Sequence, residues 1–311
     1  MPEPLVTILT APKPFVDAHI STIQRNALRS WLALGSDVDI VVLGDDTGIA
    51  ENTKQLGIRH IPGVRCNDKG TPLISSMLEL ARIETKSEFM AIVNADIILF
   101  DDLLKAIRLA AAEMERFLLV GQRWDMEVTR ELKDANAFIE LRKQIPEKAK
   151  LHPPAGSDYF IFPRTCYESI PDFAIGRAGW DNWFIFKSRF ERWKVIDGTQ
   201  QVTIVHQDHD YSHLPGGQPH YRLPETKKNV ALGGGDHTIF ALFDAQYQLE
   251  DGRISRKPWT IKKILREIEI MPLSFLHSQT LGKWFYYLFH PRKGYAAIRS
   301  ALLSRNEEQE S

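Results

Sequence analysis

The chain has 311 residues, enough for one or two domains, and its composition of 43% hydrophobic and 25% charged residues excludes a disordered or fibrous protein. Its 39 Lys and Arg residues are balanced by 40 Asp and Glu residues, which gives a formal net charge of −1. A protein that coats nucleic acid usually carries a strong basic excess, so we expect no nucleic-acid partner.

Short apolar runs alternate with amphipathic stretches through the first part of the chain. Strands are predicted at residues 5–10, 39–43, 59–61 and 88–93, and helices at residues 21–34, 51–56, 71–85 and 101–117. Continuous apolar strands that alternate with helices are typical of a parallel sheet covered on both faces. We therefore predict an α/β fold with a Rossmann-like, mostly parallel sheet.

The second part of the chain differs in character. A strand is predicted at residues 118–121 and a polar helix at 131–150, and residues 152–237 are dense in aromatic residues, Gly, Asp and His. Residues 256–305 hold ten Lys and Arg residues, several aromatic residues and only two acids, Glu267 and Glu269. We expect one α/β domain over residues 1–250, a helical basic extension over 251–305 and a disordered acidic tail over 306–311.

Two features indicate the compartment. The only cysteines, Cys66 and Cys166, are too few for a disulfide framework or a cysteine zinc site, so we interpret them as free thiols. The sequence shows no secretory signal, and no run approaches the roughly 18 apolar residues of a membrane span. We expect a cytoplasmic protein, soluble or peripheral at a membrane.

Polar residues follow the predicted strands. Thr10, Asp45, Asp46 and Asp96 fall at carboxyl ends of strands, where open parallel sheets bind their ligands. The turn at residues 10–14 has no Gly-x-Gly-x-x-Gly, and the chain has no Walker-type loop. A nucleotide bound here would therefore be held by acidic residues and a metal.

Four motifs carry the candidate chemistry. The strand that ends in Asn94-Ala95-Asp96 delivers a carboxylate suited to Mg²⁺ or Mn²⁺, although an aspartate before a helix can also be a cap. Asp158, in a turn before an aromatic strand, could bind sugar hydroxyls or simply shape the turn. His206 ends a further strand and opens a run with His209 and His213, which favours a metal site over a structural role.

The fourth motif is Trp180-Asp181-Asn182-Trp183. Aromatic faces and carboxylates together recognise sugars, and an acid in a partly apolar cleft can have a raised pKa that suits a general base. The alternative is that both tryptophans pack in the core and that Asp181 caps a helix.

Together these motifs resemble nucleotide-sugar-dependent glycosyltransferases of the GT-A fold, family 2-like, over roughly residues 5–245. Asn94-Ala95-Asp96 stands where that family has its Asp-x-Asp metal motif, with Asn in place of the first acid. Residues 180–183 look like its acceptor-side acidic motif, and His206 matches its late histidine. Thr10, Asp45 and Arg65 match, more loosely, the positions that hold the base and ribose.

The resemblance implies transfer of a sugar from a nucleoside diphosphate sugar to a hydroxyl of a glycan or lipid-linked glycan. The nucleotide-binding half would cover about residues 1–120 and the acceptor half about 121–250. Asp96 and His206 would hold Mn²⁺ or Mg²⁺, and Asp181 would be the general base of an inverting transfer. Asn94 and Ala95 would also contact the nucleotide, and the sugar or acceptor would be bound by Arg123, Asp158, Trp180 and Asn182.

Other functions remain open at this point. Asn94 in the metal motif would suit a non-catalytic carbohydrate-binding protein on the same fold. A sugar-phosphate nucleotidyltransferase would need a Gly-rich loop, whereas residues 10–16 hold Lys13 but no glycine. A metallohydrolase using His206, His209 and His213 lacks the His-Glu-x-x-His spacing.

The basic, aromatic residues 256–305 have two interpretations. Such a segment can lie on an anionic membrane surface, and it can equally be a solvated helical face that docks on the catalytic domain.

Overall fold

The computed structural model describes residues 3–154, 156–209, 223–297 and 299. Asp210 and His213 and the predicted tail at 306–311 therefore lie outside the described residues. The chain divides into two compact units, which are described separately. The α/β unit comprises Met1–Ser188 and Trp193–Lys257, and the C-terminal unit comprises Arg189–Arg192 and Pro258–Ser311.

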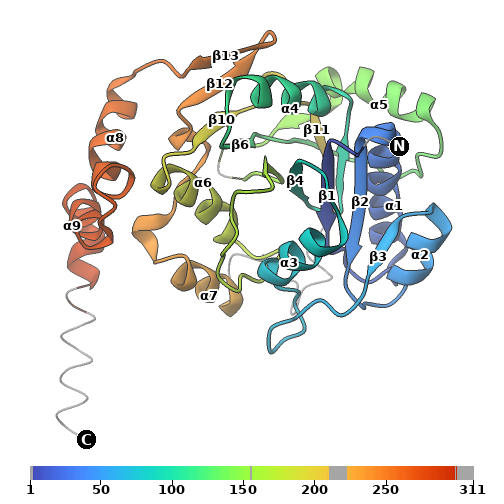
Figure 1. Cartoon of the computed structure of the whole chain (residues 1–311), viewed down its shortest axis with the longest axis horizontal. Helices are drawn as coiled ribbons and strands as arrows, with labels where there is room; N and C mark the ends of the chain where they lie inside the picture. The colour runs from blue at the N-terminus through green and yellow to red at the C-terminus, as the bar shows by residue number, and fades with distance from the viewer. Residues whose placement is uncertain (1–2, 155, 210–222, 298, 300–311) are drawn as a thin grey trace, which may run out of the picture. The chain divides into compact units, whose positions relative to one another are not determined.

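A nine-stranded sheet forms the centre of the α/β unit, in the order β13-β12-β10-β6-β9-β4-β1-β2-β3 (Figure 1). Its strands are β1 (Val6–Thr10), β2 (Val38–Leu43), β3 (Arg59–Ile61), β4 (Phe89–Val93), β6 (Phe117–Val120), β9 (Tyr159–Pro163), β10 (Lys194–Asp197), β12 (Tyr247–Glu250) and β13 (Arg253–Arg256). Only β9 and β13 run antiparallel to their neighbours in this sheet. The predicted mostly parallel sheet is confirmed.

Helices cover both faces of this sheet. The unit contains α1 (Ala18–Leu32), α2 (Ile49–Leu56), α3 (Ile74–Glu84), α4 (Asp102–Glu113), α5 (Ala135–Lys148), α6 (Trp180–Phe190, which ends in the C-terminal unit) and α7 (Pro224–Leu232). Since side chains alternate along a strand, Tyr159 and Ile161 of β9 join the core that α1 and α4 cover. Phe160 and Phe162 point to the other face, where both rings contact Phe184 of α6.

Some predicted helix boundaries differ from the observed ones. The first helix begins at Ala18 rather than at residue 21, because the Asp17 side chain accepts a hydrogen bond from the Ile20 amide at 2.8 Å. The helix predicted at residues 101–117 ends at Glu113, and its last predicted residue instead begins β6.

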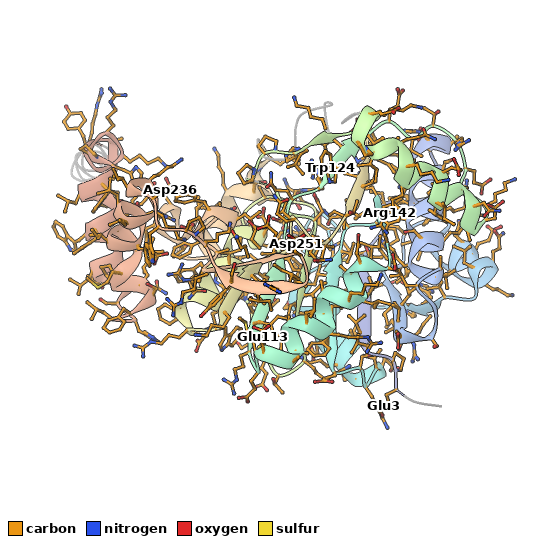
Figure 2. The ribbon with its side chains drawn as sticks, turned by 90° about the horizontal axis from the view of Figure 1, so that it is seen from above. Glu3, Glu113, Trp124, Arg142, Asp236 and Asp251 are labelled. Atoms are coloured by element: carbon orange, nitrogen blue, oxygen red, sulfur yellow. The ribbon has the colours of Figure 1, made fainter. Side chains whose placement is uncertain are left out.

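A second, four-stranded sheet was not predicted as a sheet. Its order is β5-β11-β7-β8, with β5 (Ile97–Leu99), β11 (Ile204–Gln207), β7 (Trp124–Met126) and β8 (Lys150–Leu151). A separate apolar cluster lies between this sheet and α5, and Figure 2 labels Trp124 on β7 and Arg142 on α5 at this side of the unit.

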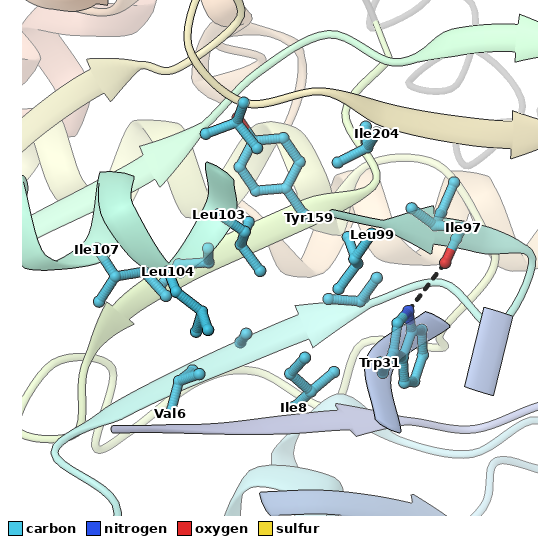
Figure 3. Close-up of a cluster of buried hydrophobic side chains, with 14 of the residues drawn as sticks. Val6, Ile8, Trp31, Ile97, Leu99, Leu103, Leu104, Ile107, Tyr159 and Ile204 are labelled. Atoms are coloured by element: carbon cyan, nitrogen blue, oxygen red, sulfur yellow. Dashed lines mark hydrogen bonds between the residues drawn. The ribbon is translucent and has the colours of Figure 1, made fainter. Parts of the chain in front are cut away.

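Strand β5 joins the two cores. Ile97 and Leu99 belong to the main core, whereas Ile98, on the opposite side of the strand, belongs to the smaller one. The Trp31 indole on α1 donates a 2.9 Å hydrogen bond to the Ile97 carbonyl (Figure 3). The chain is therefore fixed directly after residues 94–96.

The C-terminal unit contains α8 (Ile261–Ser274) and α9 (Gln279–Phe289), and residues 291–297 are also helical, in agreement with the predicted helical extension. Thr260 and Ser278 cap their amino termini through side-chain oxygens. Among the described residues, no helix combines the length and apolar character that spanning a bilayer requires.

Candidate functional site

A cavity of about 920 Å³ opens in the α/β unit, a volume suited to a substantial small molecule. The loops after β1 and β4, the turn before β9, the first turn of α6 and the end of β11 form its walls. Of the predicted site residues, nine line it: Asn94, Ala95, Asp96, Arg123, Asp158, Trp180, Asp181, Asn182 and His206. The cavity thus lies where the open α/β sheet predicts a ligand.

Asp96 is placed by strand pairing. β5 begins directly after it and pairs antiparallel with β11, with His206 opposite Ile97. The Asp96 carbonyl accepts hydrogen bonds from both the backbone N–H and the side-chain amide of Gln207, at 3.3 and 3.0 Å. His206 Nε2 consequently lies 3.9 Å, and His209 Nε2 3.2 Å, from Oδ2 of Asp96.

These three side chains fit a divalent cation. One ligand atom each from Asp96, His206 and His209 lie within 4.8 Å of one another. Oδ1 of Asp96 is buried, and it has no hydrogen-bond partner among the described residues, an arrangement that a bound cation would satisfy. One carboxylate with two imidazoles suits Mn²⁺ better than Mg²⁺, which prefers oxygen ligands.

The charges around Asp96 favour its ionised form. Burial alone would raise the pKa of Asp96, but the hydrogen bond from His209 and the nearby His206 and Lys13 hold it well below its usual range. Burial would lower the pKa of His206, yet the carboxylates of Asp125, Asp208 and Asp96 raise it to about 9. The Asp96 carboxylate therefore faces a protonated His206, and binding of a metal ion by His206 would release that proton.

Lys13 is a site residue for which the sequence analysis proposed no role. It follows β1, and the Gln24 side chain holds it by accepting from its N–H at 2.6 Å and donating to its carbonyl at 2.9 Å. Lys13 Nζ lies 3.2 Å from Nε2 of His209. Burial lowers the pKa of Lys13, partly opposed by Asp96. Its place between Pro12 and Pro14 at a strand end is a signal that could have been used.

Arg123 links two acids at the edge of the cavity. Its guanidinium donates to Oδ1 of Asp125 at 2.8 Å and to Oδ2 of Asp158 at 2.6 Å. The other oxygen of Asp158 accepts from the Asn94 side-chain amide at 2.6 Å. Asp158 therefore holds Asn94 and Arg123 in place, and its predicted contact with sugar hydroxyls stays a prediction.

Asp125 and His152 also belong to this network and were missed from the sequence. Nδ1 of His152 lies 2.6 Å from Oδ2 of Asp125, and Nδ1 of His206 lies 3.3 Å from Oδ1. Asp125 enters the site because β7 pairs in parallel with β11, with Asp125 opposite His206. The three residues of β7 are too few to show an alternating strand pattern in the sequence.

Asp181 lies in the first turn of α6. Oδ1 of its carboxylate accepts a 2.9 Å hydrogen bond from the Gly179 N–H, and burial raises the pKa of Asp181 to about 6 despite that bond. Gly179 has φ +107°, and a Cβ there would come within 3.1 Å of the Val230 backbone nitrogen on α7. Only glycine suits the turn that positions Asp181.

The two tryptophans are packed into the core. Trp180 is 4% exposed and contacts the rings of Phe160 and Phe184 at centroid distances of 4.8 and 5.7 Å. Trp183 is 7% exposed and packs on Phe173 at 5.2 Å. The Asn182 amide donates to the Phe240 carbonyl at 2.7 Å. Trp180 and Asn182 still contribute to the cavity wall.

The three residues predicted for base and ribose do not line the cavity. Thr10 is buried, Asp45 accepts a 2.8 Å hydrogen bond from the Gly63 N–H, and Arg65 is exposed with Glu79 at 3.6 Å. The Asp and Lys or Arg residues that line the cavity but were absent from the predicted site set are Lys13, Asp17, Asp46, Lys69 and Arg177. Arg177 pairs with Glu225 at 3.0 Å.

No family model and no curated protein matches this chain. Among solved structures, it is similar to glucosyl-3-phosphoglycerate synthase of Mycobacterium tuberculosis, with 17% identity over 75% of this chain and 82% of that one and a TM-score of 0.43. The same enzyme with Mg²⁺ and uridine diphosphate gives 16% identity, 83% and 87% coverage and a TM-score of 0.45.

A mannosyltransferase of Pyrobaculum calidifontis, solved with GDP-mannose and Mn²⁺, gives 14% identity, 65% and 56% coverage and a TM-score of 0.40. At such identities and scores the similarity says nothing of activity, which has to be inferred from the cavity.

Replacing Asp181 by Asn should stabilise the protein at neutral pH. The folded pKa of about 6 lies above the ordinary 3.8, so Asp181 contributes most stability below pH 4 and loses that contribution as the pH rises through 6. Asp181→Asn should raise the free energy of unfolding at pH 7.5 by up to about 3 kcal/mol, less where solvent in the cavity screens the charge, and by less at pH 5. Urea unfolding at both pH values measures this.

The exposed Asp68→Asn serves as the matched control and should change stability little at either pH. An Asp181→Asn protein that is less stable than the original at pH 7.5, or whose gain does not depend on pH, contradicts the burial of this carboxylate.

Proposed function

We propose that the protein is a metal-assisted glycosyltransferase that moves a sugar from a nucleoside diphosphate sugar to a hydroxyl acceptor. One observation carries the proposal: a cation-binding group of Asp96, His206 and His209, with Lys13 beside it, shares a single cavity with the raised-pKa carboxylate of Asp181. A diphosphate needs the first group, and an attacking hydroxyl needs the second.

The diphosphate would bind at the Asp96 end of the cavity. A divalent ion held by Asp96, His206 and His209 would supply Lewis-acid stabilisation of the charge on the departing diphosphate. Lys13, fixed through its backbone by Gln24, would donate from Nζ to phosphate oxygens. Asp46 lines the cavity near the ends of β1 and β2, where we place the base and ribose; Thr10, Asp45 and Arg65 remain predictions for that contact.

The acceptor would bind beside Asp181. A carboxylate with a pKa of about 6 is mostly ionised at neutral pH, and it is basic enough to take the proton of a hydroxyl as that oxygen attacks the anomeric carbon. Attack from the face opposite the diphosphate inverts the anomeric centre. Arg123, Asp158, Trp180 and Asn182 complete the acceptor side of our proposal, with a glycan or lipid-linked glycan as acceptor.

The non-catalytic carbohydrate-binding alternative rests on Asn94. The Asn94 amide donates a hydrogen bond to Asp158, so the side chain at this position stabilises the wall of the cavity. Asp96, His206 and His209 supply three ligand atoms without any contribution from residue 94. An amide at residue 94 is therefore compatible with a cation site.

Nucleotide binding should require the metal and Asp96. In thermal unfolding with UDP or GDP at 100 times its Kd, Mn²⁺ should add about 2.7 kcal/mol of stability, and chelator should remove that gain. Asp96→Ala and His209→Ala should abolish the gain, because each removes a ligand atom. Asp68→Ala, an exposed aspartate outside the cavity, is the control. A flat response to every base and metal, with a folded protein, would refute the diphosphate site.

Replacing Asp181 should lower the rate of turnover without changing nucleotide binding. With water as acceptor, Asp181→Asn should lower the rate of nucleotide-sugar hydrolysis by about 100-fold or more, because the general base is lost. The metal-dependent thermal shift with nucleoside diphosphate should stay unchanged, since Asp181 is not among the cation ligands. Near-normal hydrolysis by this variant would show that Asp181 is not the general base, and it would not contradict the proposed nucleotide-binding site.

A further inference from the structure

Helix α8 presents an exposed apolar stripe. Apolar residues recur every three or four positions, at Ile261, at Ile264 and Leu265, at Ile268 and at Met271, and therefore lie on one face of the helix. All five are exposed, and Ile261 reaches 79%. This face is the reverse of an ordinary amphipathic helix, whose apolar side is covered by its own domain.

Helix α9 carries a second such stripe. Leu281, Trp284 and Leu288 share one face, and the latter two are 70% and 72% exposed. Exposed Phe275 and Leu276 lie in the connection between the helices. Side chains project outward from both helices in Figure 2.

The contact between α8 and α9 uses other residues. Gly282 of α9 lies so close to Leu273 of α8 that a Cβ at residue 282 would collide with that side chain. Ile270, Leu273 and Tyr286 are buried. Packing of the two helices thus leaves both stripes uncovered within the described part of this unit.

Within this unit the stretch 258–297 is predominantly basic, whereas Glu191 and the tail residues Glu307, Glu308 and Glu310 are the acids outside it. Residues 258–297 contain two acids, Glu267 and Glu269. Glu267 pairs with Arg189 at 2.6 Å and Lys263 at 3.0 Å, and Glu269 pairs with Arg266 at 2.9 Å and His290 at 3.0 Å. The exposed charged side chains of that range are all basic: Lys262, Lys283, Arg292 and Lys293.

We propose that the C-terminal unit lies on an anionic membrane surface, with the stripes of α8 and α9 in the interfacial region and the basic side chains at the lipid headgroups. Exposed Trp284 and Tyr295 are residue types that favour this interface. A second copy of the chain fits less well, because two such faces would bring like charges together. The proposal goes beyond the transferase activity and does not depend on it.

The test is flotation of the full chain with vesicles of phosphatidylcholine alone or with about one third phosphatidylglycerol, a strongly anionic surface. The chain should bind the anionic vesicles and bind neutral ones at least about ten-fold more weakly. Trp284→Ser/Leu288→Ser should lower binding to anionic vesicles about ten-fold or more. The matched control, Ile83→Ser/Ile139→Ser, removes exposed apolar residues of α3 and α5 and should bind normally.

Lys283→Gln/Arg292→Gln tests the charge separately and should weaken binding roughly ten-fold, with little effect on folding because both side chains are exposed. If the apolar double variant does not fold, vesicle binding by this charge variant still tests the proposal. Absence of vesicle binding, or binding unchanged in both variants, would overturn the proposal. A dimer in sedimentation velocity that Trp284→Ser/Leu288→Ser dissolves would assign the face to self-association instead.

Discussion

The pairing of β5 with β11 is the constraint on which the candidate site depends. Gln207 is fully buried at the end of β11, and both its backbone N–H and its side-chain amide donate hydrogen bonds to the Asp96 carbonyl. Its side-chain oxygen accepts from Asn26 of α1 at 3.0 Å, which ties the pair to the main core. Losing a buried hydrogen bond of this kind costs about 1–3 kcal/mol, so Asp96 and His206 are held together by the fold itself.

The same pairing concentrates charge in one cavity. Asp96, His206, His209 and Lys13 bring one carboxylate and three nitrogen groups together, and burial makes each unpaired charge costly. A divalent ion and an anionic diphosphate would both find complementary partners in this group. Asp181 reaches the cavity from a different element, α6, where the Gly179 turn positions the carboxylate and burial makes it more basic.

Much of this arrangement follows from local sequence patterns. The apolar runs ending at Thr10, Leu43 and Val93 are strands of the predicted sheet, and the position of Asp96 after a strand placed it at a ligand-binding edge. The motif at residues 180–183 was found because acids between aromatic residues are chemically distinctive. The sequence could not tell that both tryptophans pack in the core while Asp181 lines the cavity.

The rest depends on contacts between distant parts of the chain. β5 and β7 have three residues each, and their pairing with β11 joins positions about 80 to 110 apart. Asp125 enters the site through the pairing of β7 with β11, and His152 through the pairing of β7 with β8. Lys13 is held there by its backbone hydrogen bonds to the Gln24 side chain. In residues 256–305 the composition showed basic and aromatic character, but the exposed stripes became visible only once the buried helix faces were known.

The most direct test of the central claim is anomalous X-ray scattering from crystals grown with Mn²⁺ and a nucleoside diphosphate. The account predicts one strong manganese peak within bonding distance of Asp96 and of at least one of His206 and His209, with the diphosphate on the same ion and beside Lys13. A nucleotide bound elsewhere, or bound in this cavity with no metal at Asp96, would contradict it.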